Sequence, residues 1–553
     1  MEPKNKRSRY NLRSVQNDTN ILNVRYWTRS KVRPLGGIEQ LHQPQEENTI
    51  AIRKRKPTTK QMVCKLIDIN AFCILKIFDG LNLIELATVA DTCSRLRKLA
   101  HYHFQSKYSH QISNVVDFGK IERNSTELIT IPEAAMIFRN FGKYMRSLKI
   151  DAWNFKYTNV AINNKLLYLI KEYCTPMLQD LSLKNFYIKP TDTRNFYALF
   201  KSIHHLSLSN IMTEEPNKWA LKMPLCKSLE FEELEPVVVN EFLERRFPAL
   251  EKISFRFIYD DWNSNFLKFL RLHPNLRHIA IVDVYLATID NLRAIGETGL
   301  QLETFQFNGV QRMSKSAFLE AIKPFGEMKT LKSFTMNCFY NSVEGLLEDF
   351  VINGVPIQYL HLKHAELNDK AISHLLKLKT IKTLIFRNME SPNVDRLFGI
   401  ASEMMSLNEF QIKCYETISC ESLGKLLIRN QQLSTLKIDA FEMNINEKAF
   451  NGFVNILKNR PQPIKLNIEF FNQMMKLNVP KKIIDANKQW IAIKTYDQKS
   501  TGLLFYDFDT DDEFDSDWDD DSFDDDDDEL DLSMEGEIGF DYLGILRPFL
   551  DFD

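Results

Sequence analysis

The chain has 553 residues, of which 44% are hydrophobic and 26% charged, and its formal net charge is −2. This composition excludes a collagen-like or wholly disordered chain, and no stretch approaches the ~18 uninterrupted apolar residues of a membrane span. The small net charge is a balance of three regions. Residues 1–60 hold fourteen Lys or Arg against five acidic residues, residues 501–553 hold twenty-two acidic residues against Arg547, and the body between them is net +10. Such asymmetry favours charged partners or self-association.

Residues 1–62 show little apolar periodicity and are predicted to form a disordered basic arm. The N-terminus lacks the apolar core of a secretory signal, so we expect the protein in the cytoplasm, the nucleus or both. The cluster Arg53–Pro57 fits a nuclear-localisation signal and fits a solvated arm equally well. The segment Arg25–Arg33 interleaves aromatic residues with cations, as single-strand binders do. Because no predicted fold positions that segment, we expect no nucleic-acid partner, and no membrane partner either.

Residues 63–110 are predicted to form a small all-α module. Apolar residues recur there at helical spacing, at 74, 77, 78 and 81 and again at 86, 89, 90, 93, 96 and 99. Because a segment of this length can hold little core by itself, we expect its helices to bury surface against a neighbour.

The region 111–480 repeats one pattern thirteen times: apolar, two variable, apolar, one variable, apolar. Clear copies are Leu178–Leu183, Leu276–Ile281 and Leu433–Ile438. The second apolar positions of the first and last copies are Leu148 and Leu466, 318 residues apart, which gives a mean period of 26.5. An apolar residue also stands eight residues after every start, and helical apolar faces lie between the copies. A strand and a helix in every repeat predict an α/β solenoid with the strands on its concave side.

This pattern resembles the leucine-rich repeat, whose period is about 20–29 residues. The usual Asn or Cys of that family, whose side chain bonds the loop backbone, is replaced here by the apolar residue at the eighth position. We therefore expect asparagines at the seventh position to take over this role in some copies. The candidates are Asn185, Asn210, Asn308, Asn337 and Asn388.

The helical module in front of the repeats is similar to the F-box. The positions that match are Ile69, Ile74, Ile77, Phe78, Leu81, Leu86, Cys93 and Leu96. Asn70 stands where the family has proline, and Leu96 where it has Trp or Phe. An F-box followed by leucine-rich repeats resembles the F-box/leucine-rich-repeat substrate receptors.

That resemblance implies two binding surfaces. The eight matched residues would bind the adaptor subunit of a cullin-based SCF ubiquitin ligase, and the solenoid would hold a protein substrate. A second interpretation of the module stays open, in which it only caps the apolar edge of the first repeat.

Alternate residues of each repeat strand should face the concave surface. The outward positions are biased toward positive charge, which either solvates the surface or binds an acidic ligand. The candidate substrate-binding residues are Lys184, Arg256, Lys363, His361, Arg387, Lys413 and Lys437. The ligand could be an acidic or phosphorylated protein, or the tail of the same chain.

Residues 481–553 are predicted to be a mostly disordered acidic tail, because the run Asp507–Asp531 repels itself and has little apolar surface. Aromatic residues such as Trp518 punctuate the run, which suits docking on basic surfaces with apolar pockets. Ser516 and Ser522 each have Asp three residues on, as acidophilic kinases require.

No catalytic constellation is present in the sequence. It lacks a Walker loop, a GxGxxG fingerprint, a GxSxG elbow and an HExxH motif. The eight cysteines include no CxxC pair, which predicts buried free thiols rather than disulfides or a zinc site. We expect no enzymatic activity, no cofactor and no bound metal.

The sequence therefore favours a noncatalytic substrate-recognition subunit of an SCF-type ubiquitin ligase. The alternative is a nuclear leucine-rich-repeat protein with an acidic tail, similar to the acidic leucine-rich nuclear phosphoproteins. Such a protein would bind histones or act as a scaffold without a link to ubiquitination.

Overall fold

The computed structural model describes most of the chain between residues 69 and 495. The described ranges are 69–109, 115–118, 128–155, 160–175, 177–188, 199–213, 223–258, 263–284, 289–309, 314–389, 392–461, 464–470 and 476–495. They all belong to one compact unit, Lys65–Asp553. The predicted basic arm, with its two cationic segments, and the predicted acidic run Asp507–Asp531 lie outside the described residues.

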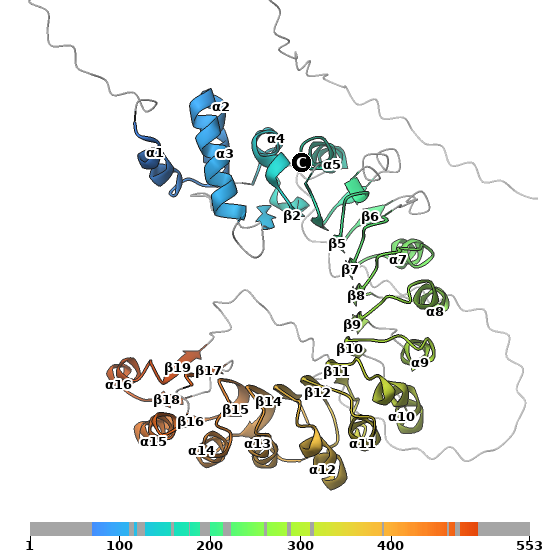
Figure 1. The fold of residues 1–553 in the computed structure, drawn as a ribbon, viewed down its shortest axis with the longest axis vertical. Helices are drawn as coiled ribbons and strands as arrows, with labels where there is room; N and C mark the ends of the chain where they lie inside the picture. Colours follow the sequence, from blue (N-terminus) through green and yellow to red (C-terminus); the bar gives the residue numbers. More distant parts are fainter. Residues whose placement is uncertain are drawn as a thin grey trace, which may run out of the picture. The chain divides into compact units, whose positions relative to one another are not determined.

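The centre of the described fold is one parallel sheet in which strands follow one another almost in chain order (Figure 1). Its fifteen strands are β1 (Val115–Asp117), β2 (Ser147–Asp151), β3 (Asp180–Lys184), β5 (His205–Ser209), β7 (Ser228–Glu232), β8 (Lys252–Arg256), β9 (His278–Val284), β10 (Thr304–Gly309), β11 (Ser333–Asn337), β12 (Tyr359–Lys363), β13 (Thr383–Arg387), β14 (Glu409–Thr417), β15 (Thr435–Glu442), β17 (Leu466–Phe470) and β19 (Ile491–Thr495). Two further pairs of short strands lie beside it, β4 (Tyr187–Ile188) with β6 (Met212–Thr213), and β16 (Asn444–Asn446) with β18 (Lys476–Asn478).

All thirteen predicted copies form strands of this sheet, from β2 to β17. Their apolar columns are in register, since Leu181 of β3 lies beside Leu148 of β2 and Leu206 of β5. The last copy is the exception. There Ile468, not Leu466, lies beside Leu436 of β15, so our assignment of Leu466 to that column is wrong by two residues. The error arises because Leu466, Ile468 and Phe470 are all apolar and occupy alternate positions of the strand. A shift by two residues therefore leaves an apolar residue in every buried position.

Two strands extend the sheet beyond the repeats that the sequence pattern revealed. β1 pairs with β2 at one edge, and β19 pairs with β17 at the other. β19 follows α16 (Lys481–Ala486), so ordered structure continues past residue 480 to Thr495. Residues 481–495, which we assigned to the tail, therefore form a helix and the last strand of the sheet.

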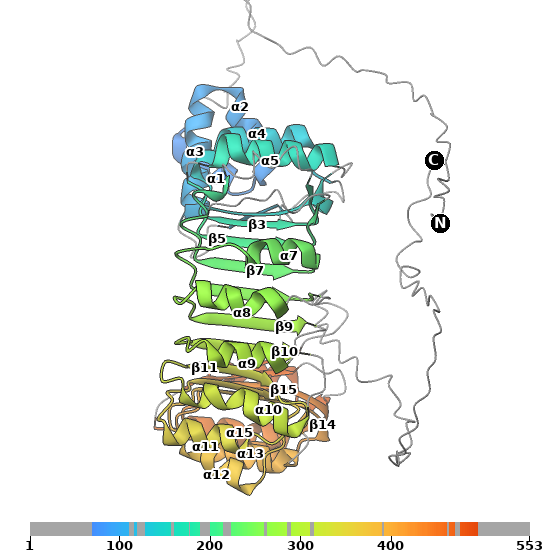
Figure 2. The ribbon, with the colours of Figure 1, turned by 90° about the vertical axis from the view of Figure 1, so that its right-hand side faces the viewer.

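Helices cover one side of the sheet, outside the curve of the strands (Figures 1 and 2). These helices are α4 (Ile131–Phe141), α5 (Val160–Cys174), α7 (Pro236–Leu243), α8 (Asn263–Leu272), α9 (Ile289–Glu297), α10 (Lys315–Ile322), α11 (Glu344–Ile352), α12 (Asp369–Lys377), α13 (Val394–Glu403), α14 (Cys420–Arg429) and α15 (Glu447–Lys458), together with α16. α12 illustrates why they form. The side chain of Asn368 accepts the backbone N–H of Ala371 at 2.9 Å and caps the helix, which buries Ile372 and Leu375.

The turn after several strands contains a residue in the left-handed conformation. At the seventh position, Asn185, Asn210 and Asn388 have φ of 60°, 48° and 46°. Asparagine tolerates this conformation better than most residues. Asn210 Nδ2 donates to Asn185 Oδ1 at 2.7 Å, and Asn185 Nδ2 donates to Asp151 Oδ1 at 2.8 Å. In these two copies the asparagine amides donate to side chains of the preceding repeat, which differs from the expected bonds to loop backbone.

The other two asparagines lie one residue earlier than we assigned them. Asn308 and Asn337 stand six, not seven, residues after the starts of their copies, Leu302 and Leu331, and belong to the strands β10 and β11. Asn337 still serves the loop, since its Oδ1 accepts the backbone N–H of Phe339 at 3.2 Å. At the eighth position, Phe186 and Ile211 are buried as the repeat requires, whereas Trp153 is 64% exposed.

The predicted helical module consists of α1 (Ala71–Phe78), α2 (Leu83–Thr92) and α3 (Ser94–Ser109). Asn70, the residue in place of the family's proline, caps α1 by accepting the N–H of Phe72 at 2.8 Å. The module packs on the first solenoid helix. Phe104 of α3 stacks on Phe141 of α4 with ring centroids 4.6 Å apart. The helices thus bury surface against a neighbour, as expected, and their hydrophobic core is continuous with that of the repeats.

The described cysteines are all free thiols, although not all are buried. Cys174, Cys226 and Cys338 are buried, and burial raises the pKa of the Cys226 thiol to about 12. Cys73 is exposed on α1, which corrects the expectation of burial for that residue.

Candidate binding surfaces

The first candidate surface is the outer side of α1. Phe72 is 67% exposed and Ile77 46% exposed, and Cys73 and Lys76 between them are exposed as well. At 100° per residue these four positions span roughly 140° of the helix circumference. The remaining side of α1 is held by Ile74 and Phe78, which are buried against the core. The helix therefore presents a mixed surface with two large apolar side chains.

The eight residues that match the F-box pattern divide into two groups. Ile77 is exposed, and Ile69, Leu81 and Cys93 are partly buried. The other four are inside the module, at exposed fractions of 4% or less: Ile74, Phe78, Leu86 and Leu96. Those four build the core that holds the helices together, and a partner could not reach them in this conformation. Phe72, which the pattern did not single out, is more exposed than any of the eight.

The second candidate surface is the concave face of the sheet. The predicted residues on it lie in separate places and do not form one column. Lys184 is on β3 and Arg256 on β8. Lys363, Arg387 and Lys413 are direct neighbours on β12, β13 and β14. The uncharged Val282, Asn308 and Asn337 lie between these groups on β9, β10 and β11.

The remaining two predicted residues lie close to that group of three. Lys437 on β15 forms an ion pair with Glu409 on β14, with Nζ and Oε1 2.7 Å apart. His361 lies on β12 two residues before Lys363, and its Nε2 atom is buried. Burial, together with the charges of Arg387 and Lys363, lowers the pKa of His361 to about 3. His361 is therefore neutral at physiological pH, and the positive charge here comes from the lysines and the arginine.

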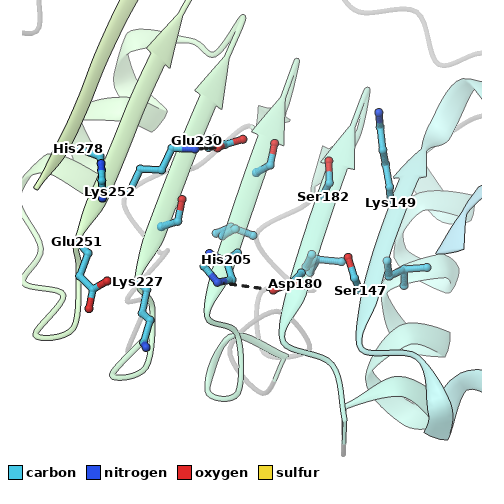
Figure 3. A pocket seen from close by; sticks show the side chains of 15 residues that line it. Ser147, Lys149, Asp180, Ser182, His205, Lys227, Glu230, Glu251, Lys252 and His278 are labelled. Atoms are coloured by element: carbon cyan, nitrogen blue, oxygen red, sulfur yellow. Dashed lines mark hydrogen bonds and ion pairs between the residues drawn. The ribbon is translucent and has the colours of Figure 1, made fainter. Parts of the chain in front are cut away.

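A hollow of about 650 Å³ lies over the other end of the sheet, above β2 to β9 (Figure 3). The small side chains of Ser182 and Ser207 occupy the central outward position of β3 and β5, and Lys149 and Glu230 flank them at the same position on β2 and β7. A second hollow of about 390 Å³ adjoins it, with Ser254 and Ala280 at the same position. Sequence reasoning overlooked these residues because it sought charge. The available signal was a Ser or Ala four residues after the start of four copies, at Ser182, Ser207, Ser254 and Ala280.

The rim of the larger hollow carries both signs of charge. Lys252 Nζ is 2.5 Å from Glu230 Oε1, and His205 Nε2 is 4.0 Å from Asp180 Oδ1 (Figure 3). Burial lowers the pKa of His278 at the far rim, and nearby Glu303 opposes this shift. A polar floor under mixed charges suits hydrogen bonds with a polar partner more than burial of an apolar one.

Within the described ranges, no group of His, Cys, Asp and Glu could hold a metal ion. No described helix is both long enough and apolar enough to cross a membrane.

Comparisons with known proteins found matches among solved structures alone. Neither a protein-family model nor a curated protein matches the sequence. Solved structures that match include an internalin, InlF, from Listeria monocytogenes, at 13% identity and a TM-score of 0.35, over 66% of this chain and 96% of that one. Rad7 in the yeast Rad7–Elc1 complex matches at 12% identity and a TM-score of 0.35, over 66% and 92%. TLR13 in its complex with ssRNA13 matches at 10% identity and a TM-score of 0.32, over 66% of this chain and 52% of that one.

At such identities the likeness concerns the fold alone. With the parallel sheet, the repeat register and the outer helices, the described part of the chain is an α/β solenoid of the leucine-rich-repeat type.

Proposed function

We propose that this protein is a noncatalytic substrate-recognition subunit of an SCF-type ubiquitin ligase. Its helical module binds the small adaptor subunit, and through it a cullin, while the concave face of the repeats holds a protein substrate. The observation that carries the proposal is the outer side of α1. Phe72 and Ile77 stand exposed on one short helix whose other side is buried. Exposed apolar side chains grouped in this way mark protein-interaction surfaces.

The construction of the module supports this division of roles. α2 and α3 are joined to the solenoid, since Asn140 of α4 donates to Asp91 of α2 at 3.0 Å and Phe104 stacks on Phe141. Arg139 of α4 forms an ion pair with the same Asp91. α1 packs on α3 through Phe78 and His103, whose ring centroids are 5.9 Å apart. A module that served only as a cap would need no exposed apolar face on its outermost helix.

The concave face supplies what a protein substrate requires. It offers a polar, hydroxyl-lined hollow over β2 to β9 and a positively charged region at β12 to β14. Specificity on such a surface comes from a few side chains within a larger contact area.

Copurification of the ligase adaptor with the tagged full-length chain tests the proposal. The informative variant is Phe72→Asp/Ile77→Lys, because acid near the start of a helix and base near its end suit the helix dipole and leave α1 intact. We expect the wild type to retain adaptor and cullin and this variant to lose both. The matched control is Ile352→Lys/Ile428→Lys, which changes two equally exposed isoleucines in the last turns of α11 and α14. Absence of the adaptor from the wild type, or equal retention by the two variants, would refute the proposal.

A further inference from the structure

The two hollows on the concave face are parts of one trough (Figure 3). Ser207, Glu230, Lys252 and His278 line both of them. Together the hollows extend from β2 to β10, across seven neighbouring strands. At about 4.8 Å per spacing, this is a length of roughly 29 Å, and about nine residues of extended polypeptide would cover it. We call this feature the trough.

The trough is deep because the outward side chains at the centre of these strands are short. Four of the seven central outward positions from β2 to β10 hold serine or alanine, at Ser182, Ser207, Ser254 and Ala280. The other three hold Lys149, Glu230 and Gln306. These seven positions therefore offer no apolar side chain larger than that of alanine, so a partner approaches the sheet closely and meets polar groups there.

Serine hydroxyls in the trough are available to a partner. Three of the serines that line it are at most 8% exposed: Ser147, Ser228 and Ser254. Among the described residues, none forms a hydrogen bond with these three hydroxyls or with those of Ser182 and Ser207. A hydroxyl both donates and accepts hydrogen bonds. Because a buried polar group without a partner costs free energy, a ligand rich in donors and acceptors gains by entering the trough.

The charges that line the trough sum to zero. Its four basic residues are Lys149, Lys227, Lys252 and Arg256. Its four acidic residues are Asp180, Glu230, Glu232 and Glu251. Two of the eight already form an ion pair across β7 and β8, between Lys252 and Glu230. This balance gives no net attraction for an acidic or a basic segment and favours an uncharged polar one.

We propose that the trough binds an extended, uncharged polar segment of the protein substrate, whose main chain bonds the serine hydroxyls. The proposal rests on the proposed function in one respect, that the bound protein is a substrate. An extended segment fits because its main-chain N–H and C=O groups are free to bond a partner. A helix has already paired these groups internally. Polar side chains of the segment bond the charged groups at the rim, such as Lys149 and Glu251.

Selection from a phage-displayed library of random linear peptides, with the immobilised full-length chain as bait, tests this binding. We expect enrichment of unphosphorylated peptides that are rich in Ser, Thr, Asn and Gln and carry little net charge. Their affinity, measured by fluorescence anisotropy, should change by less than about twofold between low and high salt, because few charges are there to be screened. Enrichment of strongly charged or mainly apolar peptides, or of no peptide, would overturn the proposal.

Ser207→Tyr is the informative variant, because Ser207 lines both hollows and a tyrosine there fills the trough from its outward side. We expect it to bind the selected peptides at least about tenfold more weakly than the wild type. The matched control is Ser333→Tyr, at another half-buried serine on the same face, which lies on β11 outside both hollows. It should bind the peptides as the wild type does, and equal affinities of the two variants would contradict the proposal.

A second variant guards against misfolding as an explanation. Ser182→Ala/Ser207→Ala removes two hydroxyls from the trough and adds no bulk. We expect a severalfold loss of affinity for the selected peptides, and an unchanged affinity would show that the hydroxyls do not bind them. Phe72→Asp/Ile77→Lys should bind the peptides like the wild type. Failure of adaptor binding and failure of peptide binding are therefore separate outcomes.

Discussion

At the scale of single residues, the turns after the strands show how this repeat departs from its family. Non-glycine residues with positive φ follow many of the strands, among them Asn185, Glu233, Phe257 and His364. A left-handed conformation costs a residue with a side chain roughly 1–2 kcal/mol. Asparagine reduces that cost at some of these positions, while Glu233 and Phe257 carry it in full. The repeats therefore contain local strain that substitution can relieve.

Replacing Glu233 with glycine should stabilise the protein. Glu233 is exposed and has φ of 52°, so its side chain contributes little and its backbone is strained. We expect Glu233→Gly to raise the free energy of unfolding by about 0.5–1 kcal/mol, measured by urea denaturation. Glu235→Gly is the control, because Glu235 is also exposed but has φ of −60°. A loss of stability as large in Glu233→Gly as in the control would contradict the expected strain.

His273 should make the solenoid sensitive to acid. Its Nε2 accepts the backbone N–H of Phe247 at 2.9 Å, and its Nδ1 bonds the carbonyl of Phe269 at 2.7 Å, which requires a neutral ring. Burial is the main cause that lowers the pKa of His273 below 6.5. The unfolded chain therefore takes up this proton first, and stability falls as the pH drops below about 6.5. Between pH 7.5 and 5.5 the wild type should lose more free energy of unfolding than His273→Gln, and equal losses would show that His273 does not contribute.

At the scale of elements, the junction between the helical module and the repeats determines whether the module is an independent domain. Phe104 and Phe141 are both buried and stack across the junction. The core is continuous through this contact. We infer that the module depends on the first repeats for its stability.

Truncation of Phe104 measures that dependence. Phe104→Ala should lower the free energy of unfolding by about 3–5 kcal/mol, because it leaves a cavity at the junction. Phe72→Ala, on the exposed side of α1, should change it by less than about 0.5 kcal/mol. Both can be compared by urea denaturation followed by circular dichroism. Similar values for the two variants would mean that the stack contributes nothing at the junction.

Most elements of the solenoid could be predicted from the sequence, because each repeat carries three apolar residues in register and a helical apolar face. The strands β1 and β19 were not predicted. An edge strand needs only one neighbour, and Val115–Asp117 is too short to show the repeat pattern. Leu466 was assigned to the wrong column because the alternation of apolar residues along β17 fits two registers equally well. The exposed side of α1 could not be predicted either. Phe72 and Phe78 are both apolar, and only the packing of α3 decides that Phe78 is buried.

At the scale of the whole molecule, the near-neutral composition conceals an uneven distribution of charge. The described solenoid contains a mixed-charge hollow at β2 to β9 and three cations in register, Lys363, Arg387 and Lys413, on β12 to β14. In the sequence, the acidic run Asp507–Asp531 follows β19, the last strand of the described sheet.

The affinity of the purified full-length chain for the purified ligase adaptor, measured by titration calorimetry, tests the proposed function most directly. Wild type and Ile352→Lys/Ile428→Lys should bind the adaptor with the same affinity. Phe72→Asp/Ile77→Lys should bind at least about tenfold more weakly, a loss of ~1.4 kcal/mol. Absence of binding by the wild type, or an affinity unchanged by the Phe72→Asp/Ile77→Lys substitutions, would contradict the assignment of this protein as a ligase subunit that docks through α1.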